Sequence, residues 1–208
     1  MGNLALIDYG AGNLHSVHNA LKAAGAADVV VTNDPELVAN ADRIVLPGVG
    51  AFAHCIEALR AIDGMVGAMD LATRHYGKPF LGICVGMQLL ADAGVEHGTT
   101  EGLGWIGGTV RAITPTPDIK IPHMGWNDVM PTSNRLLEQG EAYFLHGYHF
   151  DAADKADVLA TTNHGGPLVA AVGRDNIIGV QFHPEKSHRF GKQLLSNFSR
   201  EIRCTATA

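Results

Sequence analysis

Three short apolar runs in the first half of the chain each end near a glycine-containing turn and lead into a helical pattern. These runs cover residues 3–8, 43–46 and 79–84, and a β-branched run at 29–32 lies between the first two. Between residues 14 and 24, apolar side chains recur at helical spacing. Strands that alternate with helices in this way predict an α/β fold, in which helices flank a mostly parallel central sheet.

The predicted helices have recognisable ends. Asn13 is a suitable N-cap for the first helix, Gly25 is a suitable residue just beyond its end, and Asp34 caps a helix that starts with proline. A longer helical pattern runs over about residues 52–75. A final helix is predicted over about residues 187–202, where apolar residues recur every fourth position and should dock on the sheet.

Beyond residue 102 the pattern changes to short β-rich segments with little helix between them. These segments cover residues 109–114, 142–146, 158–162, 168–172 and 177–182. We expect this half to be antiparallel or mixed. The chain has 208 residues, of which 46% are hydrophobic and 17% charged, and it contains neither a repeat nor a linker. A single domain spanning residues 1–208 is therefore expected.

Charge and composition exclude several classes of function. With 15 basic and 21 acidic residues the formal net charge is −6, so nucleic acid is not an expected partner. Apolar runs stay well below the roughly 18 residues of a membrane span, and the first basic residue, Lys22, comes too late for a signal peptide. The three cysteines fit neither a disulfide framework nor a zinc site. These features predict a cytoplasmic protein with free thiols and no membrane partner.

Residues 82–86 read Gly-Ile-Cys-Val-Gly at a predicted strand-to-helix junction, which copies the nucleophile elbow with cysteine in place of serine. Gly82 and Gly86 would relieve the crowding of so sharp a turn, and a thiol at a helix start is favoured as thiolate. The alternative is a buried structural cysteine. The two glycines favour Cys84 as a nucleophile, whereas Cys55 and Cys204 lack this setting and are expected to be structural.

A base and a group to orient it follow the last predicted strand. His183 and Glu185 are separated by Pro184, which marks the end of the strand, where catalytic groups of α/β sheets gather. The carboxylate can accept from one ring nitrogen and leave the other facing the thiol. The alternatives are a surface pair and a zinc site, but the zinc deaminase pattern needs two downstream cysteines and only Cys204 is present.

No metal or cofactor is expected in this protein. The pairs His15/His18 and His146/His149 lack the glutamate of a His-Glu-x-x-His zinc motif, so ordinary polar or packed histidines are favoured.

Acyl transfer also needs donors for an oxyanion. The N–H of Val85, the residue after the nucleophile, supplies one by the geometry of the elbow. The second could come from residues 47–50, which read Pro-Gly-Val-Gly at the end of a neighbouring predicted strand. Such turns are common, but three signals here converge on one edge of one sheet.

With these motifs in hand, the chain resembles the class I (triad) glutamine amidotransferases nearly end to end. The shared motifs are residues 47–52, 82–90 and 181–187. Residues 8–14 (Asp-Tyr-Gly-Ala-Gly-Asn-Leu) and 122–127 (Pro-His-Met-Gly-Trp-Asn) are similar to segments of one subgroup, the glutaminase subunits of imidazole glycerol phosphate synthases. The fold expected from this resemblance is that of a class I glutamine amidotransferase.

The resemblance implies a mechanism and a set of site residues. Cys84 would attack the glutamine carboxamide, His183 would move the proton, and Glu185 would orient His183. The amides of Val49 and Val85 would form the oxyanion hole, and the first would need to reorient its peptide. The residues that match glutamine-holding positions are Gly50, Gln88, Glu96, Gly147 and Tyr148. For Gln88 and Glu96, the alternative is an ordinary exposed helix face.

The resemblance also implies a heterodimer with a (βα)8-barrel cyclase, which would receive the ammonia for histidine biosynthesis. Tyr9, Gly10, Asn13 and Lys186 match positions near that interface, and the alternative for Lys186 is a solvated lysine. The chain departs from the family in having Val85 where leucine is commoner, and in residues 147–149. Only the second departure bears on glutamine or interface contacts.

Two alternatives to this function stay open at this point. One is a paralogous glutaminase that supplies ammonia to another acceptor, such as a surface-sugar pathway. The other is a thiol sensor on a related fold, which would not need the glutamine-holding residues.

Overall fold

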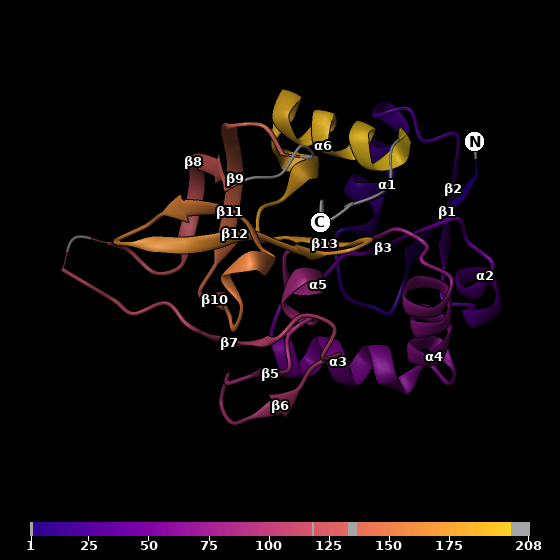
Figure 1. Cartoon of the computed structure of the whole chain (residues 1–208), viewed down its shortest axis with the longest axis horizontal. Coiled ribbons are helices and arrows are strands. Elements are labelled where there is room, and N and C mark those ends of the chain that lie inside the picture. Colours follow the sequence, from indigo (N-terminus) through magenta and orange to yellow (C-terminus); the bar gives the residue numbers. More distant parts are fainter. Residues whose placement is uncertain (1, 118, 133–136, 201–208) are drawn as a thin grey trace.

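A large mixed sheet, parallel in one half and antiparallel in the other, forms the centre of the computed structural model, which describes residues 2–117, 119–132 and 137–200 (Figure 1). Its strands in spatial order are β2 (Asp28–Thr32), β1 (Asn3–Ile7), β3 (Arg43–Leu46), β4 (Phe80–Ile83), β13 (Ile177–Val180), β12 (Pro167–Arg174), β11 (Val158–Asn163), β8 (His123–Pro131) and β9 (Gly140–His146). Neighbours pair in parallel from β2 to β13 and antiparallel from β13 to β9. The predicted α/β class and the mixed second half are confirmed.

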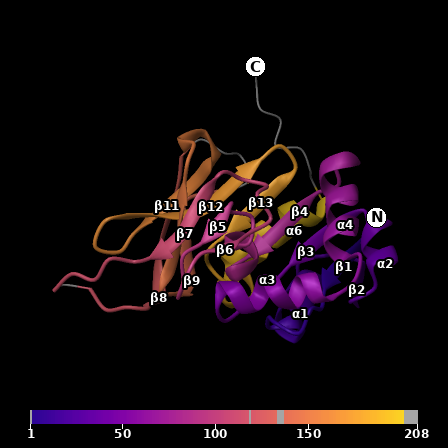
Figure 2. The same ribbon diagram turned by 90° about the horizontal axis from the view of Figure 1, so that it is seen from below.

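Helices cover both faces of the parallel half, with α1 and α6 on one face and α3 and α5 on the other (Figures 1 and 2). The helices are α1 (Leu14–Ala23), α2 (Pro35–Ala39), α3 (Phe52–Ala61), α4 (Met65–Asp70), α5 (Val85–Gln88) and α6 (His188–Arg200), and shorter turns of 3-10 or π helix lie at Leu71–His75, Lys155–Asp157 and Pro184–Lys186. None of the helices in the described part of the chain is long and apolar enough to cross a membrane.

The predicted caps of α1 and α2 are present. The Asn13 side chain accepts from the Ser16 N–H at 3.3 Å, and the Asp34 side chain accepts from the Glu36 N–H at 2.8 Å. Gly25 follows α1 with φ +99°, a left-handed conformation that glycine adopts without steric cost.

The helix expected over residues 52–75 is interrupted, which corrects that prediction. Ile62 is extended after α3, and Gly64, at φ +77°, reverses the chain before α4 begins. Apolar residues recur on both sides of the break because each helix buries its own apolar face, Cys55, Ile56 and Leu59 in α3 and Met65 and Met69 in α4. Periodicity alone therefore could not locate the interruption.

The second half contains strands that the sequence did not predict. β8 was missed, and a separate four-stranded sheet was also unexpected; its strands are β10 (Tyr148–Ala152), β7 (Gly108–Ala112), β5 (Ala93–Gly94) and β6 (Thr100–Glu101). α6 matches the predicted final helix and buries Leu194 and Phe198, while the last residues of that prediction, 201–202, lie outside the described residues.

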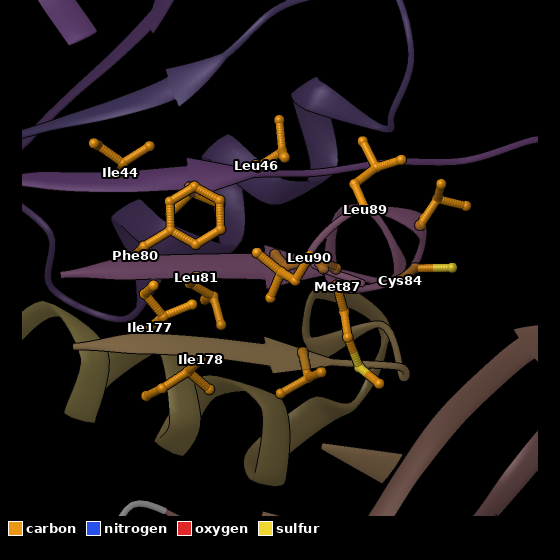
Figure 3. Close-up of a cluster of buried hydrophobic side chains, with 14 of the residues drawn as sticks. Ile44, Leu46, Phe80, Leu81, Cys84, Met87, Leu89, Leu90, Ile177 and Ile178 are labelled. Atoms are coloured by element: carbon orange, nitrogen blue, oxygen red, sulfur yellow. The ribbon is translucent and has the colours of Figure 1, made fainter. Parts of the chain in front are cut away.

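Three adjacent parallel strands, β3, β4 and β13, form the platform of the core (Figure 3). Ile44, Phe80, Leu81 and Ile178 on these strands, and Met87 after β4, are all at most 6% exposed. Each buried apolar side chain of this size stabilises the fold by about 1.5–3 kcal/mol. The platform fixes the carboxyl ends of the three strands, and these ends carry the residues described next.

Candidate active site

The segments that follow β3, β4 and β13 meet at one edge of the sheet, as expected for neighbouring parallel strands. They carry the turn at residues 47–50, Cys84, and residues 181–185. A cavity of about 310 Å³ opens there and is lined by Val49, Gly50, Cys84, Val85, Gln88, Glu96, Pro122, Leu145, His146, Gly147, Tyr148, His183 and Lys186. Most of the predicted site residues therefore share one cavity.

Cys84 occupies a strained elbow between β4 and α5. Its φ of +55° is in the left-handed region, which is costly for a residue with a side chain. A Cβ at Gly82 would lie 2.5 Å from the Gly86 carbonyl oxygen, and a Cβ at Gly86 only 1.9 Å from the Leu46 carbonyl oxygen. Both glycines are thus required for close packing, as predicted. Because α5 has only four residues, any helix dipole at Cys84 is small.

His183 and Glu185 form a buried pair beside Cys84. His183 Nδ1 lies 2.9 Å from Glu185 Oε1, and their side chains are 4% and 1% exposed. The backbone of His183 is held on both sides, by donation of its N–H to the Tyr143 carbonyl at 2.9 Å and by the Ser187 hydroxyl, which donates to its carbonyl. With Nδ1 engaged, Nε2 is the ring nitrogen left for Cys84.

The charge state of His183 follows from these contacts. Burial lowers its pKa, but hydrogen bonds to Cys84 and Glu185 and the negative charge nearby outweigh burial and raise the pKa to about 9. The imidazole is therefore protonated near neutral pH. In this form it can serve as a proton donor to a leaving group.

This raised pKa predicts a loss of stability in alkaline solution. Because the folded-state pKa is about 9 against 6.5 for the free side chain, the stabilisation is complete below pH 6.5 and is lost as pH rises through 9. We expect the free energy of unfolding to fall by up to about 3 kcal/mol over this window, measured by urea denaturation. The His183→Gln variant should lack this fall, and an equal fall in both proteins would contradict the assignment.

The turn at residues 47–50 is held through three consecutive carbonyls. The Tyr9 hydroxyl donates to the Pro47 carbonyl at 2.8 Å, the Val85 N–H to the Gly48 carbonyl at 3.4 Å, and Cys55 Sγ to the Val49 carbonyl at 3.4 Å. The middle bond matters most for chemistry, because it occupies the Val85 N–H and turns a carbonyl toward the place predicted for an oxyanion.

Tyr9, which the resemblance matches to a position near the interface, is buried beside the turn at residues 47–50. It is 5% exposed and supports the turn from below, so its side chain is not on the molecular surface. Burial, together with the neighbouring Cys55, raises its pKa above the usual range. Cys55 is a buried free thiol whose pKa burial also raises, consistent with a structural cysteine. Cys204 lies outside the described residues.

Gln88 and Glu96 both line the cavity. Gln88 is 4% exposed, which excludes an ordinary exposed helix face, and its Nε2 donates to the Tyr148 carbonyl at 3.2 Å. Glu96 is partly buried, and its Oε2 accepts from the Phe52 N–H at 2.9 Å at the start of α3. Both present polar groups suited to the amino and carboxylate groups of a small substrate.

Two polar residues at the site were not predicted as functional. Gln181 is fully buried, and its Nε2 lies 3.8 Å from Cys84 Sγ. His146 is 6% exposed and packs in the cavity wall, where Nδ1 bonds the Tyr148 carbonyl at 2.8 Å and Nε2 bonds His123 Nδ1 at 2.9 Å. Burial lowers the pKa of His146 to about 3, so it is neutral. A glutamine in an otherwise apolar strand end was the available signal for Gln181.

His146 is packed and hydrogen-bonded to His123 and to the Tyr148 carbonyl, and His149 pairs with Arg111 across β10 and β7. Among the described residues, no group of three or more His, Cys, Asp or Glu side chains could hold a metal ion.

Exposed apolar side chains lie beside the cavity. Leu145 lines the cavity and is 38% exposed, Met124 pairs directly with Leu145 across β8 and β9 and is 65% exposed, and Ile121, next to the lining residue Pro122, is 40% exposed. We call these three residues the apolar rim. Lys186 is exposed at the cavity mouth, with Nζ 5.6 Å from the centre of the Tyr143 ring.

Gly10 and Asn13 are also exposed, on the turn that precedes α1. Three of the four residues expected near an interface are therefore on the surface, and Tyr9 is the exception.

Comparison with known proteins gives consistent results. Residues 5–202 match the family model described as "Glutamine amidotransferase class-I". The chain is 60% identical over 200 residues to the imidazole glycerol phosphate synthase subunit HisH of Zymomonas mobilis, covering 94% of each chain. It is 56% identical to the protein of the same name from Rhodospirillum rubrum, covering 95% of this chain and 98% of that one.

Solved structures share the fold at low sequence identity. A crystal structure described as a glutamine amidotransferase superposes with a TM-score of 0.72 at 19% identity, covering 93% of this chain and 96% of that one. The PurLQS structure from Thermotoga maritima gives a TM-score of 0.69 at 19% identity, covering 94% and 97%.

Proposed function

The chain belongs to the class I glutamine amidotransferase family and functions as the glutaminase subunit of an imidazole glycerol phosphate synthase, and we propose that Cys84, His183 and Glu185 are its catalytic triad. The observation that carries this assignment is the cysteine at the strained elbow beside a buried His183, whose Nδ1 lies 2.9 Å from Glu185 Oε1. No other described cysteine has a histidine and a carboxylate arranged in this way.

The reaction proceeds by acyl transfer through the sulfur. Cys84 Sγ attacks the carboxamide carbon of glutamine, and the tetrahedral intermediate collapses as the C–N bond breaks. His183 Nε2 gives its proton to the departing nitrogen, which leaves as ammonia. Water then attacks the γ-glutamyl thioester, His183 takes a proton from it, and the C–S bond breaks to give glutamate and Cys84. Glu185 keeps Nδ1 bonded, so that Nε2 faces the sulfur throughout.

The oxyanion hole requires one peptide to turn. The Gly48 carbonyl now accepts from the Val85 N–H at 3.4 Å, a long bond. Rotation of the peptide between Gly48 and Val49 would point the Val49 N–H into the cavity and free the Val85 N–H, which gives two donors. The rotation changes ψ of Gly48 and φ of Val49, and Gly48, which has no side chain, tolerates the change.

Glutamine is the substrate, and its polar ends need partners in the cavity. We propose that Gln88, Glu96 and the backbone of Gly50, Gly147 and Tyr148 hold its amino and carboxylate groups. The location of all five in the wall of one cavity with Cys84 supports this role.

The protein works in a complex with a cyclase subunit, which we propose is a (βα)8 barrel that takes the ammonia for histidine biosynthesis. Exposed apolar groups beside a reactive cavity support docking at this edge, because a cover over the mouth keeps ammonia from solvent. The proposed contact surface comprises the apolar rim together with Gly10, Asn13 and Lys186.

Residues 1–208 are proposed to form one glutamine amidotransferase domain, which the family match over residues 5–202 supports. The chemistry needs no cofactor or metal. A cytoplasmic location is proposed because Cys84 must remain a free thiol, and the cytosol keeps thiols reduced.

The experiment that tests this function measures glutamate release from glutamine by the chain alone, and then with the histidine-pathway cyclase and its nucleotide substrate. We expect release to rise when both are added. In the Met124→Asp variant this rise should be lost while release by the chain alone persists, because a charge would be buried at the rim. Leu37→Asp is the matched control, since Leu37 is a 48% exposed apolar residue on α2.

Each alternative has its own outcome. Glutamate release that does not change when the cyclase is added would indicate a paralogous enzyme with another ammonia acceptor. No release under any condition, from a folded chain with reduced Cys84, would indicate a thiol sensor.

A further inference from the structure

Gln181 contacts both the nucleophile Cys84 and the pocket residue Gln88, and the mechanism above gives it no task. Its side chain is fully buried at the end of β13, and its N–H donates to the Ala170 carbonyl at 2.9 Å. A buried amide is costly unless its groups are paired. The partners of this amide therefore indicate what it does.

The direction of the Gln181 amide is fixed by a chain of hydrogen bonds. The Tyr148 carbonyl can only accept, so the group of Gln88 that faces it at 3.2 Å must be the NH₂. The same nitrogen lies 3.0 Å from the Gln181 side chain, which must present its oxygen to it. The NH₂ of Gln181 is consequently the end that faces Cys84 Sγ, at 3.8 Å.

We propose that Gln181 is a permanent hydrogen-bond donor to the Cys84 sulfur, which stabilises that sulfur whenever it carries negative charge. The proposal rests on the proposed function of Cys84 as the nucleophile. It identifies Gln181 as a further residue that touches a reacting atom, beside the triad.

The Gln181 amide supplies a hydrogen-bond donor to sulfur at a stage when the triad has none. After His183 has given its proton to ammonia, it is neutral and must serve as a base toward water. The Gln181 amide does not titrate, so it still donates to sulfur when the thioester C–S bond breaks and its electron pair returns to Sγ. Hydrogen bonds to charged groups are stronger than those to neutral ones, so the contact favours the thiolate over the thioester.

Two substitutions separate this role from pocket shape. Gln181→Glu keeps an oxygen for Gln88 and places a carboxylate oxygen, in place of the NH₂, toward sulfur. Gln181→Met keeps the chain length and removes both polar ends. Thr162→Val is the control, because Thr162 is a fully buried polar residue whose hydroxyl lacks a hydrogen-bond partner among the described residues.

The readout is the rate at which iodoacetamide alkylates Cys84 as a function of pH, followed by mass spectrometry of the Cys84 peptide from the whole chain. We expect the midpoint of this profile to rise by about one pH unit in Gln181→Met, because loss of one charge-assisted hydrogen bond changes the thiol–thiolate equilibrium about tenfold. The midpoint should rise by more in Gln181→Glu, which places a carboxylate beside the sulfur. In both, kcat for glutamine should fall about tenfold or more, since the lost contact is to the reacting sulfur. The Thr162→Val profile should match wild type.

Unchanged alkylation profiles in the two Gln181 variants would overturn the proposal. A raised KM with unchanged kcat would also overturn it, because Gln181 would then act only through Gln88. If Gln181→Met does not fold, Gln181→Glu decides alone, since it retains the partner of Gln88. Alkylation needs no glutamine, so this result is independent of the proposed function, which fails separately if Cys84→Ala still hydrolyses glutamine.

Discussion

Replacing Cys84 with alanine is expected to reduce glutamine hydrolysis by roughly 10³-fold or more, because the sulfur is the atom that forms and breaks the acyl bond. Cys84 alone among the described cysteines faces both His183 and the cavity. The fold should persist, since the change removes a single buried sulfur atom. The measurement is glutamate release with and without the cyclase, together with thermal unfolding of both proteins.

Cys204→Ala is the matched control for this prediction and should retain wild-type release. Residual hydrolysis within about tenfold of wild type in folded Cys84→Ala would contradict the mechanism, because the remaining groups cannot form a thioester.

Gly86→Ala is expected to destabilise the protein by about 3 kcal/mol or more and to abolish activity. The new Cβ would lie 1.9 Å from the Leu46 carbonyl oxygen, and both of these atoms belong to packed backbone that cannot rotate away. β3 and α5 would have to separate, which would move Cys84 and the Val85 N–H together. Urea denaturation and glutamate release measure the two effects.

Gly67→Ala provides the comparison, since a Cβ there meets nothing within 4 Å in the middle of α4. It should be neutral or stabilise the protein by about 0.5–1 kcal/mol, because alanine loses less backbone entropy than glycine in a helix. A similar loss of stability in both variants would show that close packing at the elbow is not the cause.

The sequence predicted those parts of the molecule whose structure depends mainly on residues adjacent in the chain. β1, β3 and β4 are short apolar runs buried on both faces, so their type and order follow from hydrophobic pattern and glycine turns. The elbow was predicted from the local pattern of residues 82–86, and the clash that requires Gly82 is also local, because a Cβ there would meet Gly86. Gly86, by contrast, is required by its contact with Leu46 on β3.

The missed features depend on partners that are distant in the chain. β8 carries glycine and polar residues in alternation and is a strand because it pairs with β9 and β11. Tyr9 begins a glycine-containing turn after a buried strand, and its hydroxyl reaches the Pro47 carbonyl, 38 residues away. The contact between Gln88 and Gln181 joins residues 93 apart. No local pattern reports such pairs.

The central claim is that Cys84 is the nucleophile that attacks glutamine in this cavity. The most direct test treats the chain with a glutamine analogue that carries an electrophilic diazoketone in place of the carboxamide, and maps the adduct by mass spectrometry. We expect one adduct, on Cys84, which forms in proportion to the loss of glutamate release and is blocked by excess glutamine. Complete inactivation with Cys84 unmodified, or an adduct on Cys55 instead, would contradict this account.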